Sequence, residues 1–159
     1  MPASLLGHRV HPMLIVFPLG LLGMGVIFDV IRFATGNAVL STASYYMIGA
    51  GIIMGLVAAV FGLVDWLAVP ANTRAKSVGG RHGVGNVVVV LLFAVSWWLR
   101  RGDPADPSVA VLVLELIALG LALVTGWLGG ELVERLGVGV DDGAGVNAPS
   151  SLSGETARR

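Results

Sequence analysis

The sequence has no cysteine and little charge. Of its 159 residues only 13% are charged, whereas 55% are hydrophobic, and an average soluble domain carries about a quarter charged residues. The lack of cysteine excludes disulfides, thiol catalysis, and zinc or iron–sulfur sites held by this residue type. Ten basic residues balance ten acidic ones, so the formal net charge is zero and no broad basic field is present for nucleic acid. So little charge cannot cover a globular surface in water, which excludes a soluble enzyme.

Four long apolar runs account for most of the chain. About 20 apolar residues in a helix cross the hydrocarbon core of a bilayer, and only a helix satisfies its own backbone there without closing into a barrel. We therefore predict an all-α, integral membrane four-helix bundle of up-down-up-down topology in residues 1–136. The expected spans are residues 12–33, 45–69, 84–100 and 108–130. Residues 137–159 are rich in glycine and polar residues, and we expect a flexible tail.

The distribution of basic residues predicts the orientation. Four spans place the N-terminus, the second connection and the C-terminal tail on one side, and that side holds seven of the ten basic residues, against three on the other. The positive-inside rule then places both termini in the cytoplasm. The many glycines allow close helix packing, which also makes a homodimer plausible.

One layer of ionisable residues lies toward the non-cytoplasmic side. Charged groups inside spans are costly and therefore candidates for function. Asp29 and Arg32 are three residues apart, a spacing that predicts an ion pair within one helix. Glu115 needs a partner, which Arg100 or Arg32 can provide, or a proton. This layer has either a structural role or a role in proton transfer.

A second layer, toward the cytoplasmic side, holds all three histidines. His11 and His82 precede different spans at a similar depth, which is the arrangement that a b-type haem needs. A non-haem metal site is an alternative, with zinc or iron bound by His8, His11, His82 and Glu131 or Asp65. Purely structural histidines are the third interpretation.

Nucleophilic catalysis has little support in the sequence. Ser96 and Thr125 lie in spans where we expect no histidine at their depth, and no glycine-rich phosphate loop has the required context. A role in electron transfer or structure is therefore favoured over an enzyme.

Three segments resemble a known family. Residues 7–20 contain a His-Pro pair followed by an apolar stretch that ends in Phe-Pro, and residues 62–66 and 126–133 supply two further motifs, the last followed by residues 137–140. Together they resemble a bacterial membrane family described as domain of unknown function 2231, over residues 7–142. The resemblance implies a four-helix bundle in the bacterial plasma membrane.

The resemblance also implies a redox setting, because some members are joined to Rieske iron–sulfur or cytochrome-like modules. The positions that match the motifs are His11, Asp65, His82, Gly130 and Glu131. The chain departs from the family where many relatives have further histidines, at Val16 and Leu136. His8 is a possible substitute.

The leading hypothesis is a haem-b-binding electron-transfer subunit that works with a redox partner protein. His11 and His82 would be the axial ligands, and Asp65 or Glu131 would hydrogen-bond to them. The alternatives are a cofactor-free interaction subunit and a proton-coupled carrier that uses Glu115, Asp29 and Asp65.

Overall fold

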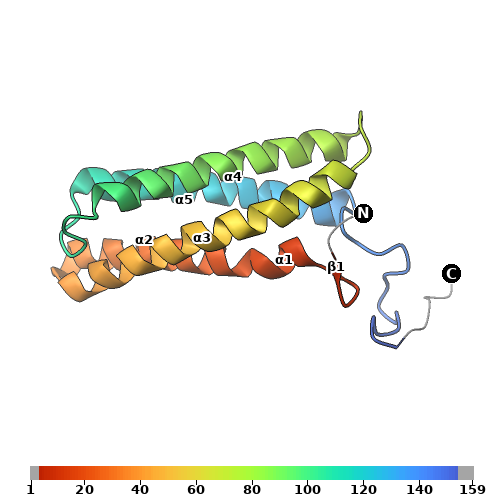
Figure 1. The fold of residues 1–159 in the computed structure, drawn as a ribbon, viewed down its shortest axis with the longest axis horizontal. Helices are drawn as coiled ribbons and strands as arrows, with labels where there is room; N and C mark the ends of the chain where they lie inside the picture. Colours follow the sequence, from red (N-terminus) through yellow and green to blue (C-terminus); the bar gives the residue numbers. More distant parts are fainter. Residues whose placement is uncertain (1–3, 154–159) are drawn as a thin grey trace.

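The computed structural model describes residues 4–153, which form a short hairpin and a bundle of long helices (Figure 1). The elements in chain order are β1 (Ser4–Leu5), β2 (His8–Arg9), α1 (Val10–Leu14), α2 (Val16–Thr35), α3 (Ala38–Ala68), α4 (Arg74–Leu99), α5 (Val109–Gly130) and the π-helical turn η1 (Glu131–Arg135).

Four helical segments are long and apolar enough to cross a bilayer. They are Val10–Thr35, Ala38–Ala68, Arg74–Leu99 and Val109–Arg135, and they confirm the predicted all-α membrane bundle. The N-terminal hairpin, the α3–α4 connection and the end of α5 lie at one end of the bundle, here called the termini end (Figure 1). The α2–α3 and α4–α5 connections lie at the other end, called the opposite end. Successive helices therefore run up and down.

Two helices begin well before the spans predicted from the apolar runs. The side chain of Asn37 accepts a hydrogen bond from the backbone N–H of Val39 at 3.1 Å and caps α3. Thr73 caps α4 in the same way, accepting from the backbone N–H of Lys76 at 3.1 Å. Such caps satisfy N–H groups that the first helical turn leaves free. Local capping, rather than hydropathy, sets where these helices start.

The apolar core is small and lies in the middle of the bundle. Only 17–22% of the apolar window of each span is buried inside the protein. Most large apolar side chains therefore face outward, as expected of helices surrounded by lipid. The core consists of Leu22, Val26, Ile48, Val89, Phe93 and Ala118.

The C-terminal segment described by the structure contains turns and no regular helix. The backbone N–H of Val138 donates to the carbonyl of Leu132 at 2.8 Å, and Ser151 lies beside Gly7 of the N-terminal hairpin. The predicted flexibility of residues 137–159 stays a prediction, and residues 154–159 lie outside the described residues.

Glycine allows α2 and α3 to approach closely at one point. A Cβ atom added at Gly51 would lie 2.8 Å from the Cγ and Cδ2 atoms of Leu22 and 3.3 Å from the Cβ of Leu21. These atoms are held close to the α2 backbone and cannot easily move away. Only a residue without a side chain fits between the two helices here.

We predict that Gly51→Ala lowers the stability of the bundle. Overpacking of this kind costs about 1–3 kcal/mol, because the new methyl group must push α2 away from α3. Gly120→Ala is the matched control, since a Cβ there meets no atom within 4 Å. Thermal unfolding in detergent should show a lower midpoint for Gly51→Ala alone, and equal midpoints for the two variants would contradict the packing described.

Candidate functional site

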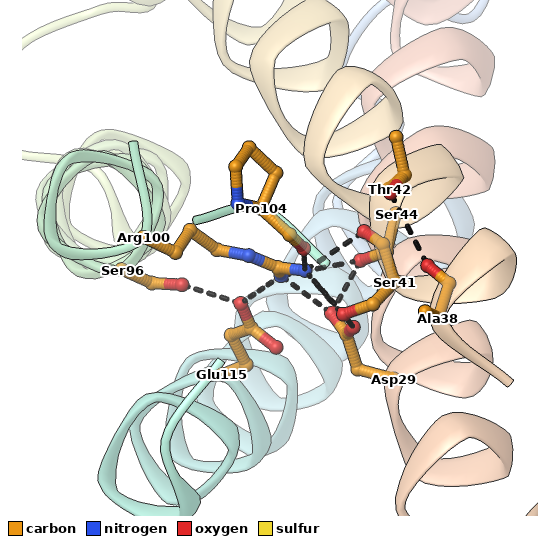
Figure 2. A network of polar contacts seen from close by, with 9 residues as sticks. All are labelled: Asp29, Ala38, Ser41, Thr42, Ser44, Ser96, Arg100, Pro104 and Glu115. Atoms are coloured by element: carbon orange, nitrogen blue, oxygen red, sulfur yellow. Dashed lines mark hydrogen bonds and ion pairs between the residues drawn. The ribbon is translucent and has the colours of Figure 1, made fainter. Parts of the chain in front are cut away.

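Polar side chains gather in two layers, one near each end of the bundle, with the apolar core between them. The layer at the opposite end is built around Arg100, which directly follows the last residue of α4. Figure 2 shows its guanidinium group between carboxylates from two other helices. The layer near the termini end is built around His11 and His82.

The guanidinium of Arg100 binds two buried carboxylates. Its Nη1 lies 2.6 Å from Oδ2 of Asp29 and its Nη2 lies 3.0 Å from Oδ1, which makes a bidentate ion pair. Nη1 also lies 3.0 Å from Oε1 of Glu115. All three side chains are fully buried, at 0% exposure. Paired charges held in this way satisfy groups that would otherwise be very costly inside a membrane protein.

Serine hydroxyls complete the cluster (Figure 2). Ser41 donates to Oδ1 of Asp29 at 2.8 Å, and Ser44 donates to Oδ2. Ser96 donates to Oε1 of Glu115. Arg100 also donates to the backbone carbonyl of Ser41 at 2.8 Å. We call these six residues, Asp29, Ser41, Ser44, Ser96, Arg100 and Glu115, the arginine cluster. It connects α2, α3, α4 and α5.

One predicted ion pair in this layer is wrong. Asp29 pairs with Arg100, and Arg32 pairs instead with Asp106 in the α4–α5 connection. Arg32 is one turn closer to the end of α2, so it reaches the connection rather than the cluster. The predicted partnership of Glu115 with Arg100 is confirmed.

The serines of the arginine cluster were not predicted from the sequence. Ser41 and Ser44 are three residues apart, and this spacing places them on one face of a helix. They also lie in the first turns of the helix that comes after the span containing Asp29. The spacing alone was a weak signal, because a serine hydroxyl in a helix can equally bond to a backbone carbonyl of the preceding turn.

The second layer brings His11 and His82 together. Their ring centroids are 6.4 Å apart and the rings are perpendicular. Nδ1 of His11 lies 2.8 Å from the carbonyl oxygen of Ala58, and Nδ1 of His82 lies 2.8 Å from that of Thr125. A carbonyl only accepts hydrogen bonds, so each Nδ1 carries a proton. In the neutral ring, Nε2 then holds the lone pair.

Asn86 extends the hydrogen-bond chain around His82. Its Nδ2 lies 3.0 Å from Nε2 of the histidine one turn earlier, and its Oδ1 accepts from the hydroxyl of Thr125 at 2.9 Å. Thr125 was expected to have no histidine at its depth, and this expectation is wrong. Helix α4 starts early enough to carry His82 inside the bundle rather than before it.

Glycines make room for both imidazole rings. A Cβ at Gly62 would lie 2.9 Å from Cε1 of His11, and one at Gly129 would lie 3.1 Å from Cε1 of His82. Each ring therefore packs on the backbone of a neighbouring helix. Gly130, the position predicted from the family motif, meets no atom within 4 Å of an added Cβ, so the ring contact belongs to the preceding glycine.

The other predicted ligands make contacts of their own. His8 is exposed on the hairpin, where its Nδ1 lies 3.2 Å from the carbonyl of Leu6. Asp65 lies 3.5 Å from Arg9. Within residues 4–153, no group of three or more histidine or acidic side chains could hold a metal ion. The non-haem metal site predicted from these residues is therefore not assembled.

Glu131 was a further candidate for that site. It is the first residue of the π-helical turn η1, and its Oε1 lies 2.5 Å from Nη2 of Arg74. This ion pair links the end of α5 to the start of α4. The hydrogen bonds predicted from Asp65 or Glu131 to the ring nitrogens are made at Nδ1 by the Ala58 and Thr125 carbonyls instead.

Four apolar spans with polar layers between them define a multi-pass α-helical membrane protein. Residues 7–142 match the model of a family described as predicted membrane protein DUF2231. The chain belongs to this family. No curated protein and no solved structure matches it significantly.

We predict that Arg100→Gln strongly destabilises the bundle. The substitution leaves Asp29 buried without its counter-ion, and removing one partner of a buried pair costs about 3–5 kcal/mol. The neighbouring Arg101→Gln is the control, because Arg101 is exposed and only stacks 3.7 Å above the ring of Trp98. Thermal unfolding of the two purified variants should separate them clearly. Similar unfolding midpoints would show that the buried pairs do not hold the helices together.

Proposed function

We propose that the layer near the termini end binds a b-type haem and that the protein is an electron-transfer subunit of the membrane. The observation that carries the proposal is the His11–His82 pair, contributed by α1 and α4 across the bundle. Haem supplies an iron that gains and loses one electron, and the protein sets its potential through the axial ligands and their burial.

The number and spacing of the histidines fit this group. A haem with bis-histidine ligation would need two imidazoles from the protein, whereas catalytic zinc usually takes three protein ligands and structural zinc four. Two imidazoles on opposite sides of one metal, each with a bond of about 2 Å, have ring centroids about 6 Å apart. The separation of 6.4 Å agrees with this span.

The surroundings of each ring support a ligand role. The hydrogen bond from Nδ1 to a backbone carbonyl fixes the ring and leaves Nε2 as the basic nitrogen, as is usual for metal-bound histidines. Among the described residues, Nε2 of His11 has no hydrogen-bond partner, whereas Nε2 of His82 lies against Asn86. Ligation by His82 therefore requires the Asn86 amide to turn away.

The setting that we propose follows from charge and family. The positive-inside rule applied to the basic residues places the termini end in the cytoplasm, and the family resemblance suggests a bacterial plasma membrane. The histidine pair would then hold the haem near the cytoplasmic face, within reach of a redox partner protein. A homodimer stays a prediction from the glycine content.

A cofactor-free interaction subunit is the second candidate. The observation that favours it is the Asn86–His82 hydrogen bond, which together with the Thr125 carbonyl satisfies both ring nitrogens without a ligand. In that case the imidazoles act as polar links between helices, a common use of histidine in membrane proteins.

We predict that the full-length protein, expressed with ample haem and purified in mild detergent, has a Soret absorption band. His11→Ala and His82→Ala should each abolish bis-histidine ligation and greatly reduce the band, because each removes one axial ligand. Absorption spectra of the oxidised and reduced proteins measure this.

His8→Ala is the matched control, because this third histidine is exposed and outside the pair. Its spectrum should equal that of the unmodified protein. A colourless unmodified protein that stays folded overturns the haem proposal and favours the cofactor-free subunit. A band that survives in both of the pair variants would place haem elsewhere.

A further inference from the structure

The arginine cluster contains more acid than base. Asp29 and Glu115 face one guanidinium group, and all three side chains are fully buried. If both carboxyl groups were ionised, the cluster would carry a net charge of −1 within the spans. An uncompensated charge there is expensive, and a buried carboxyl group usually avoids this cost by keeping a proton.

Hydrogen-bond accounting distinguishes the two carboxyl groups. Each oxygen of Asp29 accepts from one serine and from one nitrogen of Arg100. Four donors suit an ionised carboxylate, which has only acceptors. Protonation of Asp29 would break its bidentate ion pair with Arg100.

Glu115 is only half satisfied. Its Oε1 accepts from Ser96 and from Arg100. Its Oε2 is buried and has no hydrogen-bond partner among the described residues. If Oε2 were negatively charged, it would be buried with neither a hydrogen-bond donor nor a counter-ion. A protonated Oε2 is neutral and needs no counter-ion, so the protonated state costs less.

We infer that Glu115 is a proton-binding site: it holds a proton on Oε2 while Asp29 is the ionised partner of Arg100. The cluster is then neutral as a whole. This inference uses neither histidine nor haem, so it stands or falls separately from the proposed function.

The proton site lies within reach of the opposite end of the bundle. Glu115 bonds directly to Arg100 and Ser96. Arg100 also binds Asp29 of α2, and Ser41 and Ser44 of α3 bond to this aspartate, with Ser41 bonding to the arginine as well. Arg100 also donates to the carbonyl of Pro104 at 3.3 Å, and Figure 2 shows this proline beside the guanidinium. The α4–α5 connection therefore covers the cluster at the opposite end of the bundle.

Infrared spectroscopy of the full-length protein in lipid vesicles at neutral pH tests the inference. We expect one carbonyl stretching band of a protonated carboxylic acid, which shifts to lower frequency in D₂O. Glu115→Gln should remove the band and leave the unfolding midpoint at the unmodified value, because glutamine resembles the neutral acid in shape and charge. Asp106→Asn, which changes an exposed carboxyl group at the same end, should leave the band unchanged.

The absence of a protonated carboxyl band in the unmodified protein overturns the inference. A band that persists in Glu115→Gln also overturns it, since the proton would then be on another group. Ser96→Ala gives a second test that keeps both carboxyl groups. Loss of the donor to Oε1 should raise the frequency of the band, and an unchanged frequency would show that the protonated group is not Glu115.

Discussion

The pairing of Arg100 with Asp29 and Glu115 is the interaction on which the rest of the bundle depends. Helices in a bilayer gain little from burying apolar side chains against each other, because lipid is equally apolar. The core is correspondingly small, and most of each span faces outward. A buried guanidinium that must find its partners gives the helices a specific arrangement that apolar packing alone would leave open. Since its partners come from α2, α3 and α5, one side chain sets the position of α4 relative to all three of the other long helices.

Much of this fold could be predicted from hydropathy, but most of its polar contacts could not. The four apolar runs predict four helices, and alternating topology predicts that Glu115 and Arg100 share one end, while His11 and His82 share the other. The Asp29–Arg32 pair was wrong because spacing along one helix reports only local neighbours. The true partner of Asp29 is 71 residues away, and only the three-dimensional packing selects it. The early start of α4 was missed for a related reason, since a threonine cap carries no hydropathy signal.

The two polar layers satisfy their polar groups in different ways. The arginine cluster is fully buried and surrounds its two carboxyl groups with serine hydroxyl groups and one guanidinium group. The histidine layer uses imidazole rings whose Nδ1 atoms donate to carbonyls of neighbouring helices. Such carbonyls are already part of a helical ladder, and a carbonyl oxygen has a second lone pair available for a side-chain donor. From the sequence, the hydrogen bonds to the histidine rings were assigned to Asp65 or Glu131. Backbone carbonyls could not be identified as the acceptors, because a carbonyl is present at every position and carries no sequence signal. The glycines at 62 and 129 were the better signal, since they bring the ring close to the backbone.

The separation of the layers limits how they could act together. Glu115 and Thr125 are ten residues apart on α5, which is about 15 Å along a helix. The buried face between them carries Ala118 and Ala122, whose side chains cannot pass a proton. A proton held by Glu115 would therefore have no relay of polar side chains along α5 to the histidine pair. Any influence of one layer on the other must act through the electric field or through helix movement. The charge of the arginine cluster then matters to the whole span, because a change at Glu115 alters the potential in a region with little screening.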